Sequence, residues 1–216
     1  EDNPQDANRG RLAIVASSIL MQILYAARLA RHDLLRPTLR LASQITKWDS
    51  DCDKKLHRLM RYIHCTPKKR LIGWCANSLD ECSPHGYADA DFAGCDKTLR
   101  STTGACMIME GSHTRFPVAA RSIKQGCISC STPEAELVAC HYAYKNLCLP
   151  MLDLWDALLP DGWMSYLHED NQAMLKVIAT GKNPTMKTLK RCHGVDLRFL
   201  HERLSDSAGD GTGRNS

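Results

Sequence analysis

The chain has 216 residues, of which 44% are hydrophobic, and its formal net charge is +4. This length fits one large domain or one domain with an appendage, and the hydrophobic content excludes wholesale disorder. The small positive charge permits nucleic-acid binding but does not by itself indicate it.

The N-terminal part of the chain is predicted to be helical. Residues 12–30 and 38–64 carry apolar side chains at helical spacing, and Pro37 is expected to separate the two helices. The first of these stretches is the most apolar of the chain, but Gln22 and Arg28 interrupt it. We therefore expect a packed helix there and no membrane span.

From residue 71 onward the pattern changes to strands. Short apolar runs punctuated by glycines predict four consecutive strands, at 71–76, 85–90, 103–109 and 115–122. Pro117 in the last run indicates an edge strand or an irregular segment, because proline cannot donate a hydrogen bond to a neighbouring strand.

A clear helix start follows the strands at Ser131-Thr132-Pro133-Glu134, which combines a hydroxyl cap, an early proline and a glutamate at capping-box spacing. Pro150 should kink or end this helix. Further on, the patterns predict a helical piece at 151–159, a strand at 163–168, a helix at 171–179 that Gly181 stops, and a last helix at 194–204. The order of these elements predicts an α/β fold with a mixed sheet and helices packed on it.

The eleven cysteines are irregularly spaced, and only Cys127 and Cys130 form a CxxC pair. There is no second CxxC and no well-spaced pair of histidines, so a structural zinc site is not expected. Reduced thiols inside a cell, cytoplasmic or nuclear, are the ordinary interpretation. A small-molecule cofactor is not expected either, because the chain has no phosphate-cradling glycine loop and no nucleophile elbow.

Acidic residues recur at four places where predicted strands end or predicted helices begin. These residues are Asp89 and Asp91, Glu134 and Glu136, Asp170, and Asp196. Taken singly, each is a common surface or capping residue. Taken together, they indicate a site for Mg²⁺, which prefers carboxylate oxygens, and two such ions about 3.5–4 Å apart can catalyse phosphodiester hydrolysis.

In one register from about residue 24 to residue 204, the chain resembles the RNase H domain of Ty/copia-type retrotransposon Pol polyproteins. The motifs that carry the resemblance are Tyr87-Ala88-Asp89-Ala90-Asp91, Ser101-Thr102-Thr103-Gly104, the helix start from Ser131 to Ala139, and Asp170-Asn171-Gln172. An earlier segment at 24–37 resembles the family's link between polymerase and nuclease, and the segment at 48–66 resembles the helix that follows this link.

The resemblance implies three parts. Residues 1–68 would be a helical connecting segment, the end of the reverse transcriptase. Residues 69–204 would be an RNase H-like mixed sheet flanked by helices, and residues 205–216 would form a disordered tail.

The resemblance also implies the site residues. The catalytic and metal-binding set falls on Asp89, Glu136, Asp170 and Asp196, which would hold two Mg²⁺ ions, or Mn²⁺ in their place. In the wider fold a leucine and a small residue follow the catalytic glutamate, which selects Glu136 over Glu134. Asp91, Glu134 and His193 are expected to support the site. At the fourth position the chain departs from the family, because its histidine is displaced by one residue from the usual place before Asp196.

Two basic clusters flank the acidic positions along the sequence. The bases expected to contact phosphates are Lys97, Arg100, Arg121, Lys124, Lys187, Lys190 and Arg191. Such contacts bind any sequence and weaken steeply with salt. The sequence therefore predicts an endoribonuclease that hydrolyses the RNA strand of an RNA–DNA hybrid and works beside the reverse transcriptase of the same polyprotein. The alternative is an inactive remnant that only binds nucleic acid or packs against the polymerase.

Overall fold

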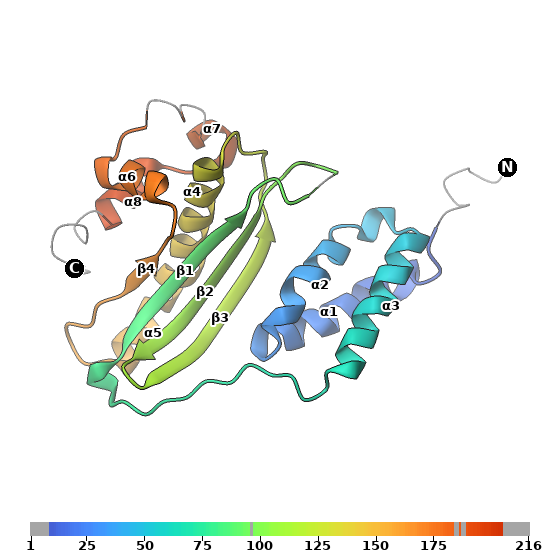
Figure 1. Ribbon diagram of the computed structural model, residues 1–216, viewed down its shortest axis with the longest axis horizontal. Helices are drawn as coiled ribbons and strands as arrows, with labels where there is room; N and C mark the ends of the chain where they lie inside the picture. The colour runs from blue at the N-terminus through green and yellow to red at the C-terminus, as the bar shows by residue number, and fades with distance from the viewer. Residues whose placement is uncertain (1–8, 96, 184–185, 187–188, 205–216) are drawn as a thin grey trace. The chain divides into compact units, whose positions relative to one another are not determined.

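The computed structural model describes residues 9–95, 97–183, 186 and 189–204 (Figure 1). Residues 205–216, which were expected to be disordered, lie outside this part of the chain. The chain divides into two compact units, Glu1–Leu71 and Ile72–Ser216. Each unit has its own core, and each is described by itself below.

Three helices form the first unit: α1 (Ala13–Leu29), α2 (Leu35–Ala42) and α3 (Ser50–Cys65). Short 3₁₀ turns at His32–Leu34 and Ile45–Lys47 join them. Helix α1 is the apolar stretch expected to be a packed helix, and it buries one face, made of Ala16, Leu20, Ile23, Leu24 and Ala27. These side chains recur every three or four residues, so one stripe of the helix faces the core.

The helix boundaries in this unit differ from those predicted. Pro37 does not separate two helices but lies in the first turn of α2, where its missing N–H costs no hydrogen bond. The predicted helix at 38–64 is interrupted between α2 and α3, because Trp48 adopts an extended backbone and is buried. Its indole N–H donates to the Asp53 carboxylate at 2.7 Å, a tertiary contact that helical spacing alone cannot reveal.

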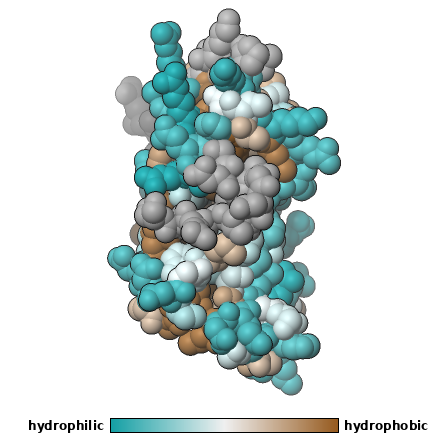
Figure 2. Space-filling view, turned by 90° about the vertical axis from the view of Figure 1, so that its left-hand side faces the viewer, coloured by the Kyte–Doolittle hydropathy of each residue, from teal (hydrophilic) through white to brown (hydrophobic). Residues whose placement is uncertain are grey.

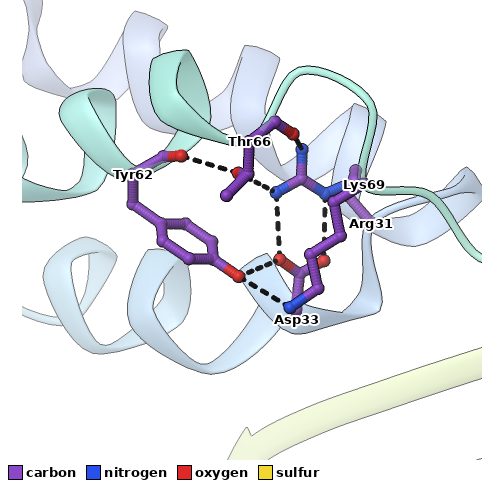
Figure 3. A network of polar contacts seen from close by, with 5 residues as sticks. All are labelled: Arg31, Asp33, Tyr62, Thr66 and Lys69. Atoms are coloured by element: carbon purple, nitrogen blue, oxygen red, sulfur yellow. Dashed lines mark hydrogen bonds and ion pairs between the residues drawn. The ribbon is translucent and has the colours of Figure 1, made fainter.

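A network of polar contacts joins the end of α3 to the turn that follows α1 (Figure 3). The Arg31 guanidinium donates two hydrogen bonds of 3.0 Å to Asp33 and two more to the Thr66 backbone and hydroxyl oxygens. The Tyr62 hydroxyl donates to Asp33 at 2.9 Å and accepts from Lys69 at 2.9 Å. The hydrogen bonds from Arg31 lower the pKa of Asp33 below its ordinary value.

A four-stranded mixed sheet in the order β3-β2-β1-β4 forms the centre of the second unit (Figure 1). Strands β1 (Ser83–Asp91), β2 (Thr102–Gly111) and β3 (Thr114–Lys124) pair antiparallel, and the short strand β4 (Tyr166–His168) pairs parallel with β1. The unit is therefore a mixed α/β fold with helices packed on its sheet, as the sequence predicted.

The helices of this unit pack mainly through α4, which contacts β1 and β2. Their bounds are α4 (Thr132–Ala143), α5 (Leu152–Leu158), α6 (Gln172–Thr180), α7 (Leu189–His193) and α8 (Leu197–Leu204). Leu137 of α4, Trp155 of α5 and Leu200 of α8 are almost fully buried in one hydrophobic cluster with Met107 of β2. This cluster anchors α4 to the sheet, and with it the acidic residues at the start of that helix.

Several turn predictions in this unit are confirmed. Ser131 caps α4 by accepting from the Glu134 N–H at 3.3 Å, and Gly181 ends α6 with a left-handed φ of 62°. Around Pro150 the helical winding changes from α through a π turn to a 3₁₀ turn. Pro117 lies in the outer strand β3 beside an irregularity in its register, as expected for a proline in a sheet.

In the rest of the chain, one further prediction of secondary structure is wrong, and another is right in type but not in its start. The apolar run at 71–76 is not a strand, because only Trp74 pairs, through a single bridge with Arg115 of β3. The last predicted helix, at 194–204, begins only at Leu197, and α7 precedes it where no helix was predicted.

Hydrophobic areas on the face shown in Figure 2 are broken up by hydrophilic side chains. Within the described residues, no helix combines the length and the apolar character needed to cross a membrane.

Candidate carboxylate site at the ends of two parallel strands

Strands β1 and β4 bring two of the predicted acidic residues to the same edge. The parallel register aligns His85 with Tyr166 and Tyr87 with His168. Asp89 and Asp170 each follow the last aligned pair by two residues, and both side chains are exposed. Because the two strands run in the same direction, their carboxyl ends meet at one edge of the sheet.

Helix α4 brings Glu136 to this edge. Ala135 and Ala139 of the helix pack against Ala90 of β1, and such small side chains let the helix approach the strand closely. The Glu136 side chain is buried, with the residue only 5% exposed. Its Oε2 atom has no hydrogen-bond partner among the described residues. A buried carboxylate oxygen left in this state is costly unless a proton or a cation compensates it.

The charges of the other two carboxylates act on Glu136. Burial, together with the negative charges of Asp89 and Asp170, raises the pKa of Glu136 to about 7, while a backbone hydrogen bond from Ala90 opposes the rise. Three predicted site residues that are far apart in the sequence therefore share one electrostatic environment.

Glu169 belongs to the same cluster, although the sequence interpretation did not select it. Burial raises its pKa to about 8, and the charges of Glu136, Asp170 and Asp89 add to the effect. One of its oxygens accepts from the Asn171 N–H at 3.3 Å, but Oε2 is buried and has no hydrogen-bond partner among the described residues. The sequence did contain a signal for the burial of Glu169. Side chains alternate along a strand, and Glu169 lies two residues after Leu167, which packs into the core, so both point to the same face.

Asp91, expected to support the site, shapes the turn that follows β1. Its backbone carbonyl accepts from the Gly94 N–H at 3.2 Å. A Cβ atom added at Gly94 would collide with the Asp91 carboxylate, so a larger residue there would displace this side chain from its place over the turn.

The two other supporting residues, Glu134 and His193, meet each other at the start of α4. Glu134 accepts from the Cys130 N–H at 2.7 Å, and its own N–H donates to the Ser131 hydroxyl. The second bond is the serine half of a capping box, whereas the glutamate bonds the residue before the cap and not the cap itself. His193 Nε2 lies 3.5 Å from Glu134 Oε1, and the two side chains are only 2% and 5% exposed. The structure thus gives both residues a local role in holding the start of α4.

Asp196 is engaged by other partners. Lys190 donates to one carboxylate oxygen at 2.7 Å, and the Arg198 N–H donates to the other at 3.1 Å, at the start of α8. The hydrogen bond from Lys190 lowers the pKa of Asp196, and Arg198 adds to the effect. The fourth predicted ligand and one predicted phosphate contact therefore form a salt bridge with each other.

The remaining bases predicted to contact phosphates differ in their surroundings. Lys97, Arg100 and Arg191 are exposed, whereas Arg121 is half-buried. Lys124 donates to Cys95 Sγ at 3.1 Å. Lys187 lies outside the described residues.

A row of histidines and tyrosines holds β4 to β1 next to the carboxylates. His85 Nδ1 and His168 Nε2 are 2.8 Å apart, and the ring of His85 stacks on Tyr166 while that of Tyr87 stacks on His168. The Tyr87 hydroxyl donates to Glu110 of β2 at 3.0 Å. Because β4 pairs through only three residues, these side chains help to fix the strand that carries Glu169 and Asp170.

The cluster fits a hard divalent cation in its chemistry. Among the described residues, no group of three or more histidine, cysteine or acidic side chains is already arranged to hold a metal ion. The donors that converge are nevertheless all carboxylates, which Mg²⁺ prefers, and the buried Oε2 atom of Glu136 lacks any partner. All eleven cysteines, including Cys127 and Cys130, are free thiols.

No family model matches the chain, and no solved structure matches it either. The carboxylate cluster and the sheet that carries it are therefore the features from which a function is inferred.

Proposed function

We propose that the second unit is a nuclease that hydrolyses the RNA strand of an RNA–DNA hybrid with two divalent ions, the RNase H domain of a Ty/copia-type retrotransposon polyprotein. The observation that carries the proposal is the convergence of Glu136, buried and unpaired at Oε2, with Asp89 and Asp170. The family resemblance of the motifs around these three residues supports it, and the mixed sheet with helices packed on it is compatible with it.

Asp89, Glu136 and Asp170 would hold the ions, which supply an activated water and stabilise the leaving oxygen when they are bound. The roles of these residues would differ because their surroundings differ. Asp89 and Asp170 are exposed and can approach a phosphodiester, whereas Glu136 is held rigidly by the packing of α4 on β1. Burial raises the pKa of Glu169 to about 8, so this group holds a proton at neutral pH and would release it when a dication binds beside it.

The unit would bind a hybrid through its phosphates and would recognise it by its groove shape and its 2′-hydroxyl groups. The bases Lys97, Arg100 and Arg191 are suited to such contacts because their side chains are exposed and a phosphate can reach them. The reverse transcriptase of the same polyprotein would be the protein partner, since it produces the hybrid.

A second candidate function is binding of nucleic acid without cleavage. The observation that favours it is the salt bridge between Asp196 and Lys190, which occupies the fourth carboxylate that the family resemblance assigns to the metal site. In that case the unit would be an inactive remnant that retains the sheet and the basic surface.

Cleavage of a labelled RNA–DNA hybrid by the full chain, with Mg²⁺ and with EDTA, separates the two candidates. The nuclease proposal expects cutting of the RNA strand that needs Mg²⁺, spares duplex DNA and disappears in Asp89→Asn. Asp80→Asn is the matched control, because Asp80 is an exposed aspartate in the 3₁₀ turn before β1, at the opposite end of that strand from Asp89. Full cutting by Asp89→Asn would rule out the site, and a folded chain that binds the hybrid without cutting it would favour the remnant.

A further inference from the structure

One face of α3, in the first unit, is strongly basic. Four exposed side chains line a shallow hollow of about 340 Å³ on this helix: Lys54, His57, Arg58 and Arg61. In the part of the chain that the structure describes, none of the four forms a hydrogen bond or an ion pair. The hollow therefore presents cationic groups that remain available to a ligand.

The acidic residues of α3 are used elsewhere. Asp51 pairs with Lys55 at 2.6 Å, one turn along the helix. Asp53 accepts from the Arg11 and Leu12 N–H groups and from the Trp48 indole, so its carboxylate caps the start of α1. The excess positive charge of the hollow is thus a property of the fold and not only of the composition of the helix.

The spacing of these bases suits a row of phosphates. Lys54, Arg58 and Arg61 follow one another at four- and three-residue steps, which places them on one side of the helix. At 1.5 Å per residue they span roughly 10 Å along its axis. One strand of a duplex carries a phosphate about every 3.4 Å of its axis, so roughly three phosphates match this length.

We infer that the basic face of α3 binds the phosphate backbone of nucleic acid, as a second contact site apart from the carboxylate cluster. The inference does not depend on cleavage. A membrane surface fits less well, because a helix that lies on lipid needs large apolar side chains beside its bases. The apolar residues Leu56 and Leu59 of α3 face the core of the first unit instead. The exposed Tyr62 is held by Asp33, and the exposed Met60 is a single side chain rather than an apolar stripe.

The inference is tested by measuring the affinity of the full chain for a labelled RNA–DNA hybrid in EDTA at several salt concentrations. The variant Lys54→Gln/Arg58→Gln/Arg61→Gln removes three bases of the hollow. The variant Lys55→Gln/Lys68→Gln/Arg70→Gln removes the same net charge from exposed positions of the same unit and serves as the control. Circular dichroism establishes that both variants are folded.

The hollow variant should lose at least about tenfold in affinity, and its slope of log K against log salt should shrink by about 2 to 3, one phosphate contact for each base. The control should lose much less. Equal losses in the two variants, no binding of the hybrid by the wild-type chain, or tighter binding to phosphatidylserine vesicles than to the hybrid would each overturn the inference. If the chain binds the hybrid through α3 but does not cleave it, the nuclease proposal is contradicted and the inference about α3 is supported.

Discussion

Burial raises the pKa of Glu169 and the carboxylate of Glu136 adds to the rise, and each of the two side chains buries one oxygen that has no hydrogen-bond partner among the described residues. The folded chain therefore holds protons on these groups at a pH where the unfolded chain has released them. This pair sets the behaviour of the site with pH and with cations.

Stability should depend on pH through this pair. With pKa values of about 7 for Glu136 and about 8 for Glu169, against ordinary values of 4.5, the folded state binds more protons than the unfolded state between pH 5 and pH 8. The free energy of unfolding should therefore fall as the pH rises through this window when EDTA is present. In Glu169→Gln the decline should be weaker, as urea unfolding at several pH values would show. Glu202→Gln, a change on α8, is the control, and a slope in Glu169→Gln equal to that of the wild type would contradict the prediction.

Divalent cations should reverse the pH effect. At pH 8, where the carboxyl groups tend to be ionised, Mg²⁺ should raise the thermal midpoint more than it does at pH 5, because a cation bound to the folded state stabilises it. Asp89→Asn should lose most of this gain, whereas Asp80→Asn should keep it. Differential scanning fluorimetry at matched ionic strength measures the effect. The same gain in both variants would mean that Mg²⁺ acts elsewhere on the chain.

Glu134 and Glu136 lie two residues apart, yet their substitution should have opposite consequences. Glu134→Ala removes the acceptor of the Cys130 N–H and part of the helix cap, so it should destabilise the fold by about 1 kcal/mol. Glu136→Gln removes a buried charge that lacks a partner, so stability at pH 8 should be unchanged or higher while cleavage is lost. Urea unfolding and the hybrid assay together test both effects. If Glu136→Gln were the less stable variant, the burial argument would be wrong.

The network at the end of α3 should contribute to the stability of the first unit. Asp33→Asn weakens the bonds from Arg31 and Tyr62, and a loss of about 1 kcal/mol is expected because the groups are partly exposed. The pKa of Asp33 is lowered in the fold, so its contribution is present above the unfolded pKa and is lost as the pH falls through the folded value. Asp51→Asn, at an exposed ion pair, should change little. Equal effects of the two substitutions at pH 7 would show that the network adds nothing.

Cys95 should be the cysteine that alkylates fastest near neutral pH. Hydrogen bonds from Thr98 and Lys124 lower its pKa to about 6, so much of the thiol is already the reactive thiolate at pH 7. Mass spectrometry after brief treatment with iodoacetamide would rank the eleven cysteines. Lys124→Gln should slow the modification of Cys95 without slowing that of Cys65, an exposed thiol in the first unit. An unchanged rate at Cys95 would show that Lys124 does not activate it.

The sequence predicted features that depend on neighbouring residues better than features that depend on contacts between distant parts of the chain. The cap at Ser131 and the stop at Gly181 depend on a few neighbouring residues, so their patterns sufficed. The break at Trp48 depends on Asp53 and on burial in the unit, and the run at 71–76 lacks a full partner strand. Neither cause is visible in the periodicity of one segment.

For the site, the resemblance assigned Asp89, Glu136 and Asp170 to one metal site, and in the structure the charges of Asp89 and Asp170 act on Glu136. Their catalytic role stays a prediction. Glu169 escaped notice because a charged residue after a strand is ordinarily a surface group, and only its register behind Leu167 turns it inward. The sequence also did not predict the salt bridge of Asp196 with Lys190, because it assigned the first residue to metal binding and the second to a phosphate contact.

The two outer strands of the sheet also bear on how separate copies of the chain behave in concentrated solution. On one side, Pro117 interrupts β3, and the Trp74 backbone already exchanges two hydrogen bonds with Arg115. On the other side, β4 is only three residues long. In the described part of the chain, these features shorten the regular rows of amide groups that the outer strands offer to a strand from another molecule. Strand addition between folded copies should therefore be disfavoured at Arg115 to Pro117 and along β4.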